Sequence, residues 1–345
     1  MLSIGPVRTS FDFDGAGKRA GFIDLPHSDG DLAFSAVRVP VGVIAGGSGP
    51  TVLMTAGNHG DEYEGQAILH RLMRGLTPGQ VQGRLILLPA LNAPAVSARR
   101  RVSPLDGGNM NRSFPGDPGK GPTGAIAAFV TAHLLPRADV VLDFHSGGAA
   151  TRYVDCGFLC IGPDANLNEA NLALADAFGA PFTMICPIDG TGGDFDTAAH
   201  LRGKRFLACE LGGMGTLSDE SFTIGWNGAL RVLRHLGCVA QPDLPDPHET
   251  RFIEAGPDAG FATAAHHGLA EIRVRLGQDV AKGDALATLF DTHNFGEIRG
   301  KISAAQGGVV SVIRRNPMVR PGDHLCLVSR EIPRADILTD RMRAS

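Results

Sequence analysis

The sequence predicts an α/β fold in which a mixed, mostly parallel sheet is covered by helices and followed by a small all-β region. From about residue 33 to 240, apolar strand-like runs alternate with helix-like segments, which is typical of such a sheet with helices on both faces. Residues 250–330 instead show short strand-like runs separated by glycine and proline turns. A chain of 345 residues, 43% of them hydrophobic, is long enough for two domains.

The elements of the first domain, residues 1–242, follow from hydrophobic periodicity. In segment 63–75, for example, Ile68, Leu69, Leu72 and Met73 recur at helical spacing. The predicted helices are 63–75, 123–135, 166–178 and 219–236, and the predicted strands are 34–44, 51–56, 84–90, 139–144, 154–161 and 205–209.

A polar, proline-rich segment, 241–248, is typical of a linker and leads into a second, β-rich domain at residues 250–345. Two stretches, 274–286 and 309–325, are similar to the half-motifs of biotinyl and lipoyl carrier domains, which are small barrel-sandwich folds. Those carriers expose a lysine on the hairpin between the halves, but the corresponding segment here, 290–296, has none. We therefore expect a barrel-sandwich-like scaffold without a carrier function.

Composition excludes several classes of function. A net charge of −4 and an isoelectric point near 6.3 give no electrostatic reason to expect nucleic acid or an anionic membrane as a partner. No apolar run reaches the roughly 18 residues needed to span a bilayer. The six cysteines are scattered in mostly apolar surroundings, and the N-terminus does not resemble a signal peptide. We expect a cytoplasmic protein with reduced cysteines.

A histidine and a carboxylate follow the predicted strand 51–56 at a glycine-containing turn. His59 and Glu62 lie three residues apart, and imidazole and carboxylate are ligands that a divalent ion such as zinc accepts. A catalytic zinc needs three protein ligands and one position for water, so a third ligand is expected elsewhere. The same spacing also arises by chance, so this motif alone leaves a metal site open.

The third ligand is expected at the end of another strand, because ligands of open α/β sheets collect beyond the carboxyl ends of the strands. His145 ends the apolar run from Val140 and is followed by small residues. Asp143 lies on the same side of that strand, where it could accept a hydrogen bond from a ligand histidine. The alternative is a structural histidine and a buried aspartate paired with an arginine.

Hydrolysis at such a metal also needs a group that moves protons. Glu210 ends the run from Arg205 and precedes Leu-Gly-Gly, so its carboxylate is predicted at a strand end, where partial burial would raise its pKa. A helix cap or an ion pair is the alternative role.

A long polar loop, 97–114, separates a predicted strand from a predicted helix, and its length suggests function. Guanidinium groups bind carboxylates and stabilise oxyanions, so arginines in this loop suit a substrate that is both an amide and an amino acid. A solvated basic surface is the alternative for Arg99 and Arg100.

Five motifs in one order resemble those of the succinylglutamate desuccinylase and aspartoacylase family. They are HGDE at 59–62, NAPA at 92–95, NMNRSF at 109–114, DFH at 143–145 and CELGG at 209–213. The resemblance implies a zinc-carboxypeptidase-like catalytic domain with a β-domain that helps to cover the site. It also implies one zinc ion per chain and a small N-acyl amino acid as substrate.

The family resemblance further implies a role for each matching residue. His59, Glu62 and His145 would bind zinc, and Glu210 would act as general acid and base. Arg101 would polarise the scissile carbonyl, and two residues would hold the substrate carboxylate, Asn111 and Arg112.

Two stretches, 145–148 and 193–205, resemble the branch of the family that deacetylates N-acetyl-L-2,4-diaminobutyrate in ectoine breakdown. Such a substrate carries a free amino group, so an acidic partner is expected in the pocket. The candidates are Asp189, Asp194 and Asp196, which could equally be loop or helix-cap residues.

We therefore predict a zinc-dependent deacylase of small N-acyl amino acids. The resemblance favours deacetylation of N2-acetyl-L-2,4-diaminobutyrate, and succinylglutamate desuccinylase or aspartoacylase activity on another N-acyl amino acid is an alternative. One alternative is a metallocarboxypeptidase, which uses similar ligands but accepts longer peptides. A second is a binding module that does not catalyse a reaction and whose metal is structural. The sequence leaves both a monomer and a homo-oligomer open.

Overall fold

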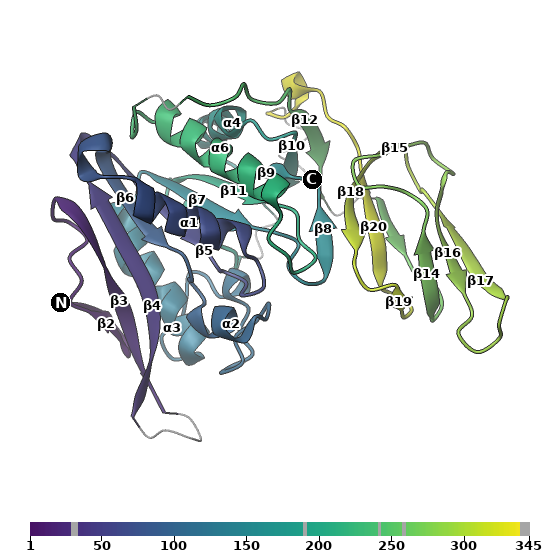
Figure 1. The fold of residues 1–345 in the computed structure, drawn as a ribbon, viewed down its shortest axis with the longest axis horizontal. Helices are drawn as coiled ribbons and strands as arrows, with labels where there is room; N and C mark the ends of the chain where they lie inside the picture. Colours follow the sequence, from purple (N-terminus) through teal and green to yellow (C-terminus); the bar gives the residue numbers. More distant parts are fainter. Residues whose placement is uncertain (29–33, 189–191, 241–242, 257–259, 339–345) are drawn as a thin grey trace.

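An 11-stranded sheet runs through the α/β part of the molecule. The structure is a computed structural model and describes residues 1–28, 34–188, 192–240, 243–256 and 260–338 (Figure 1). In spatial order, the strands of this sheet are β1 (Leu2–Ile4), β2 (Val7–Thr9), β3 (Gly17–His27), β4 (Ser35–Ala45), β6 (Gln82–Leu88), β5 (Gly47–Ala56), β7 (Val140–His145), β11 (Arg205–Glu210), β9 (Cys156–Ile161), β10 (Phe182–Pro187) and β12 (Arg251–Glu254).

The predicted α/β class with a mixed sheet is confirmed, but parallel pairs do not dominate the sheet, contrary to the prediction. Parallel pairing joins β6, β5, β7 and β11, and separately β9, β10 and β12. Antiparallel pairing joins β1 through β4 to β6, and β11 to β9. Strand β3 of this antiparallel part was not predicted, because it contains glycine, proline and charged residues, which have low strand propensity.

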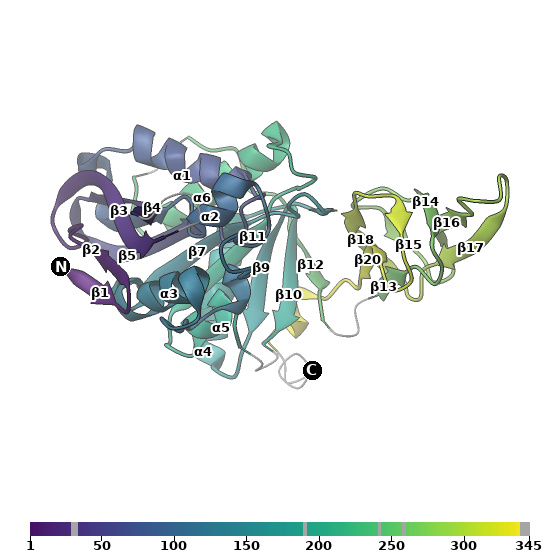
Figure 2. The same ribbon diagram turned by 90° about the horizontal axis from the view of Figure 1, so that it is seen from below.

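Helices cover both faces of the sheet (Figure 2). On one face, Leu72 of α1 and Phe178 of α4 share a core with Leu142 of β7. On the other face, Phe195 of α5 packs in a core with Val141 of β7. All four predicted helices are present, whereas α2 and α5 were not predicted. The helices are α1 (Glu64–Gly75), α2 (Ala93–Ala98), α3 (Gly121–Phe129), α4 (Ala165–Phe178), α5 (Phe195–His200) and α6 (Asp219–His235), with short helical turns at η1 (Pro78–Gln80), η2 (Met110–Arg112), η3 (Val130–Leu134), η4 (Leu135–Arg137) and η5 (Arg334–Asp336).

The C-terminal part is β-rich, as predicted. It is built of two antiparallel sheets and extends away from the α/β part (Figure 1). One sheet contains β13 (Gly260–Thr263), β20 (His324–Ser329), β18 (Gly308–Arg314) and β15 (Asp279–Val280), and its β18 also pairs with β8 (Thr151–Tyr153). The other contains β17 (Ile298–Ser303), β16 (Ala285–Phe290), β14 (Gly268–Ile272) and β19 (Met318–Val319).

The chain crosses between the two parts more than once. After the proline-rich segment, β12 pairs with β10 as an edge strand of the large sheet. After β20, Arg330 forms an ion pair with Glu254 of β12, and Ile337 is buried against the α/β part beside Leu159 and Ile185. Among the described residues, no helix is long and apolar enough to cross a membrane.

Candidate active site

Three neighbouring parallel strands bring the predicted site residues to one edge of the sheet. β5 pairs with β7, and β7 pairs with β11, so their carboxyl ends meet. His59 and Glu62 lie in the loop after β5, while His145 ends β7 and Glu210 ends β11 directly opposite it in register. The topology therefore gathers side chains that are up to 151 positions apart in the chain.

The loop between β5 and α1 is held in place by close packing. Gly57 has a φ of +67°, a conformation that glycine adopts without strain. A Cβ atom on Gly60 would lie 2.0 Å from the backbone of Ala95 in α2, so no larger side chain fits there. Asp61 accepts a hydrogen bond of 2.8 Å from the backbone N–H of Ala149, which ties this loop to the loop after β7.

His59, Glu62 and His145 form a compact buried cluster. The Nδ1 atom of His59 lies 2.8 Å from Oε1 of Glu62, and Nδ1 of His145 lies 3.0 Å from Oε2. All three residues are at most 6% exposed, so water does not screen their interactions. The Glu62 carboxylate thus bridges the two imidazole rings.

The outer nitrogen of each imidazole is held by an acceptor. Nε2 of His145 lies 2.8 Å from Oδ2 of Asp143, and Nε2 of His59 lies 3.1 Å from Oδ1 of Asn109. A carboxylate and an amide oxygen only accept hydrogen bonds, so each ring donates from Nε2 and directs Nδ1 at Glu62. Asp143 is fixed in turn by the Thr55 hydroxyl, at 2.6 Å.

The electrostatics of the cluster require positive charge. Burial would raise the pKa of Glu62, but the charges and hydrogen bonds of His145 and His59 outweigh it and lower that pKa to about 2. Burial would likewise lower the pKa of His145, but the carboxylates of Asp143 and Glu62 raise it well above its usual value. Glu62 is therefore an anion that needs a cation beside it.

The three residues fit a metal ion. One ligand atom from each of His59, Glu62 and His145 can be chosen so that all lie within 4.8 Å of one another. Two imidazole nitrogens and one carboxylate oxygen are a donor set suited to a divalent transition metal. The hydrogen bonds to Nε2 orient both rings for this use, as is usual for metal-binding histidines. The cluster can thus hold a metal ion.

Glu210 presents an unsatisfied carboxylate to the same cavity. Its Oε2 atom is inaccessible to solvent and has no hydrogen-bond partner within the ranges that the structure describes. Burial and the charge of Glu62 raise the pKa of Glu210 to about 8, and His145 and Arg101 only partly oppose this shift. A carboxyl group with such a pKa can exchange protons near neutral pH.

The polar loop 97–114, the arginine loop, contributes residues to the cavity wall. Arg101 is half-exposed and lies 3.5 Å from Oε1 of Glu62, and Arg112 is exposed at the cavity wall. Asn111 also lines the cavity, but its Oδ1 accepts a hydrogen bond of 2.9 Å from the backbone N–H of Phe195. Asn111 therefore has only its Nδ2 group left for a substrate.

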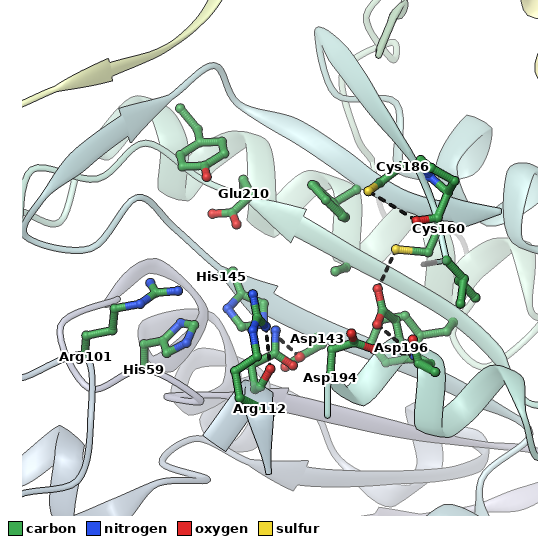
Figure 3. A pocket seen from close by; sticks show the side chains of 18 residues that line it. His59, Arg101, Arg112, Asp143, His145, Cys160, Cys186, Asp194, Asp196 and Glu210 are labelled. Atoms are coloured by element: carbon green, nitrogen blue, oxygen red, sulfur yellow. Dashed lines mark hydrogen bonds and ion pairs between the residues drawn. The ribbon is translucent and has the colours of Figure 1, made fainter. Parts of the chain in front are cut away.

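The cavity has a volume of about 290 Å³ and contains residues that sequence reasoning did not single out. Tyr153 of β8, Cys160 and Cys186 lie in its wall. Figure 3 shows Arg101 and His59 on one side of His145, and Cys160 on the opposite side. No sequence signal marks these residues, because which face of β8, β9 or β10 borders the cavity depends on the sheet order.

Of the three aspartates considered as partners for a substrate amine, two line the cavity, Asp194 and Asp196. Asp189 lies outside the described residues. Burial and the neighbouring Asp194 raise the pKa of Asp196 to about 7. Asp194 is also the N-cap of α5, where its side chain accepts a hydrogen bond from the Thr197 N–H.

Comparison with known proteins shows the family of this chain. Residues 48–236 match the sequence model of the succinylglutamate desuccinylase/aspartoacylase catalytic domain. The chain belongs to this family and is an amide-hydrolysing enzyme.

Among its relatives is the N-alpha-acetyl-L-2,4-diaminobutyric acid deacetylase of Halomonas elongata, which is 40% identical over 95% of this chain and 96% of that protein. A succinylglutamate desuccinylase from Silicibacter sp. TM1040 superposes with a TM-score of 0.91 at 35% identity, over 96% of this chain and 100% of that one. The product-bound ectoine utilization protein EutE (DoeB) of Ruegeria pomeroyi gives a TM-score of 0.89 at 36% identity, over 95% and 99%.

Asp143→Asn should weaken metal binding. The amide would place an N–H₂ group or a weaker acceptor against Nε2 of His145, so that ring would lose its fixed orientation. Loss of such a partner lowers metal affinity by about 10- to 100-fold. The affinity for a divalent ion can be measured by competition with a chelator.

Asp139→Asn is a matched control. Asp139 precedes the first residue of β7, at the opposite end of this strand from His145, and accepts a hydrogen bond of 2.8 Å from Thr51 N–H. This variant should bind metal as the parent protein does. Equal affinities in the Asp143→Asn variant and the parent would contradict the role of Asp143.

Glu210→Gln should stabilise the metal-free protein in a pH-dependent way. The pKa of Glu210 is raised in the folded state, so ionisation of Glu210 disfavours folding as pH rises from about 4.5 to about 8. The variant removes this cost, and its melting temperature at pH 8 should exceed that of the parent by about 2 °C or more. Thermal unfolding in the presence of chelator measures this difference.

Near pH 4.5 the gain should disappear, because Glu210 is then protonated in the folded state and its ionisation no longer opposes folding. The exposed residue Glu220 provides the control, since Glu220→Gln should change stability little at either pH. A melting temperature lowered by Glu210→Gln at pH 8 would contradict the raised pKa of the Glu210 carboxyl group.

Proposed function

We propose that this protein is a zinc-dependent deacylase that removes the acetyl group from N2-acetyl-L-2,4-diaminobutyrate, in ectoine catabolism. The observation that carries the proposal is the buried His59–Glu62–His145 cluster with the unpartnered carboxylate of Glu210 in the same cavity. The choice of substrate is supported by two relatives, the 40% identical deacetylase of Halomonas elongata and the ectoine utilization protein EutE of Ruegeria pomeroyi.

Zinc is the proposed metal, held by His59, Glu62 and His145. When bound, it would acidify a water molecule and polarise the acyl carbonyl group. The two neutral imidazoles and the single carboxylate would leave the ion with net positive charge, which favours both effects. Asp143 would keep the ring of His145 in place, since it holds the outer nitrogen of that ring.

Glu210 is the proposed general acid and base. Its Oε2 atom has no partner within the described part of the chain, so it is available to accept a proton from water. The same group can then donate that proton to the departing amine nitrogen, because its raised pKa makes it a competent acid. Bond cleavage at the amide carbon would release acetate and the free amino acid.

Positive side chains are proposed to orient the substrate. Arg101 lies beside Glu62 at the edge of the cluster, where its guanidinium group can donate to the acyl oxygen as negative charge develops there. Arg112 and the Nδ2 group of Asn111 are proposed to bind the α-carboxylate. This places the amide bond of the substrate over the metal cluster.

The two parts of the chain have distinct proposed roles. Residues 1–242 are proposed as a zinc-carboxypeptidase-like catalytic domain, and residues 250–345 as a β-rich domain that covers the site. The support is that β18 pairs with β8, whose Tyr153 lines the cavity. Pairing of β12 with β10 and return of Ile337 to the α/β part would hold the two domains together.

Hydrolysis of a substrate panel tests the proposed reaction. With added zinc, the protein should release acetate from acetyl-diaminobutyrate faster than it cleaves succinyl or formyl derivatives of other amino acids, or short peptides. Glu210→Gln should retain zinc but lose at least about 100-fold in kcat, because the proton carrier is gone. Acetate release and metal content are the two measurements.

Three results would contradict the proposal. Preferred cleavage of peptides would indicate a carboxypeptidase, and faster cleavage of a succinyl derivative would indicate another activity of the family. Zinc retained without any hydrolysis by the parent protein would indicate a binding module with a structural metal.

A further inference from the structure

The active-site cavity carries two further carboxyl groups on the side away from Arg101. Arg101 lies beside the metal cluster, whereas Asn111 and Arg112 lie next to the segment that carries Asp194 and Asp196. Figure 3 shows both aspartates beyond His145 when seen from Arg101, with Asp196 directed at Cys160. A substrate whose amide lies over the metal cluster therefore meets a cationic group, Arg112, and two acidic groups side by side beyond His145.

The two aspartates hold different positions at the start of α5. Asp194 precedes the first turn as the N-cap, and its Oδ1 accepts a hydrogen bond of 2.9 Å from Thr197 N–H. Asp196 lies within that turn; its Oδ1 accepts a hydrogen bond of 2.7 Å from the same N–H, and its Oδ2 accepts one from the thiol of Cys160 on β9. Asp196 also shares a hydrogen bond with Asp194, so the two carboxyl groups are in contact.

The aspartate pair has one neighbouring cation for two carboxyl groups. Neither Asp194 nor Asp196 forms a salt bridge within the described ranges, and the charge of Arg112 acts on Asp194. Two partly buried carboxyl groups in contact repel each other once both are ionised, and they share a proton instead. A cation entering this end of the cavity would remove that repulsion and gain charge-assisted hydrogen bonds.

The aspartate pair and the arginine loop are fixed relative to each other. Phe114 N–H donates to the carbonyl oxygen of Gly193 at 2.9 Å, and Phe195 N–H donates to Oδ1 of Asn111 at 2.9 Å. The rings of Phe114 and Phe195 stack with centroids 4.4 Å apart. Because these contacts hold the two segments together, the fold sets the distance between Arg112 and the two aspartates.

We propose that Asp196, assisted by Asp194, binds the ammonium group of a short substrate side chain and thereby selects N-acylated diamino acids. This inference rests on the proposed deacylase function and identifies its specificity determinant. The α-carboxylate lies at Arg112, the amide lies over the metal cluster, and the side-chain ammonium lies at Asp196. The cavity, at about 290 Å³, suits a side chain of two or three carbons rather than a peptide.

The test compares two substrates that differ only in side-chain charge. N-acetyl-2,4-diaminobutyrate and N-acetylnorvaline have side chains of equal length, with an ammonium group replaced by a methyl group. The parent protein should show a kcat/KM at least about 10-fold higher for the diaminobutyrate substrate. Asp196→Asn should lower kcat/KM about 10- to 100-fold for that substrate, mainly through KM, since a charge-assisted hydrogen bond is lost.

The same variant should leave kcat/KM for N-acetylnorvaline within about 3-fold of the parent, as only the ammonium contact depends on charge. A matched control is Asp164→Asn, which alters the N-cap of α4, away from the cavity, and should leave the ratio between the two substrates unchanged. Thermal unfolding of both variants verifies that they fold.

An equal loss on both substrates, or no loss on either, would overturn the role of Asp196. A parent protein that cleaves N-acetylnorvaline as fast as the charged substrate would also overturn it, while leaving the deacylase function intact. A parent protein that cleaves neither these two substrates nor any other N-acyl amino acid would overturn the deacylase function itself.

Discussion

Two imidazole nitrogens and one carboxylate converge on a single buried point, and only a cation can hold them there. The Nδ1 atoms of His59 and His145 face opposite oxygens of Glu62 at 2.8 and 3.0 Å. Without positive charge between them, these groups would present lone pairs to one another in a region from which water is excluded. Protons can supply that charge, and so can a metal ion, which would also perform chemistry.

The surrounding structure serves to keep these groups together. The parallel pairing of β5, β7 and β11 brings the loop after β5 beside His145 and Glu210. Asp143, in register with Thr55 and hydrogen-bonded to it, fixes the ring of His145. Glu210, left without a partner in the described part of the molecule, keeps a raised pKa because burial and the charge of Glu62 disfavour its ionisation. Burial of this carboxyl group lowers the stability of the folded protein when the group is ionised. The raised pKa that results suits the same group to proton transfer.

Much of this arrangement could be predicted from the sequence. The four helices and the strand ends at His145 and Glu210 followed from hydrophobic periodicity, because each element buries a continuous apolar face. The antiparallel strand β3 could not be predicted, since its stability comes from pairing with β4 along its whole length rather than from its own composition. The positions of Cys160 and Tyr153 in the cavity wall depend on sheet order and on contact with β18, which local patterns do not encode. Asn109 belongs to a sequence motif, but its hydrogen bond to His59 could not be predicted, because it depends on how the loop folds.

X-ray absorption spectroscopy of the zinc-loaded protein tests the central claim most directly. If His59, Glu62 and His145 hold the ion, the zinc-edge spectrum should show only nitrogen and oxygen neighbours at about 2.0–2.2 Å, with two of them identified as imidazole. The His145→Ala variant should lose one imidazole contribution. Sulfur neighbours at about 2.3 Å would place the metal at cysteines such as Cys160 instead and would contradict the account.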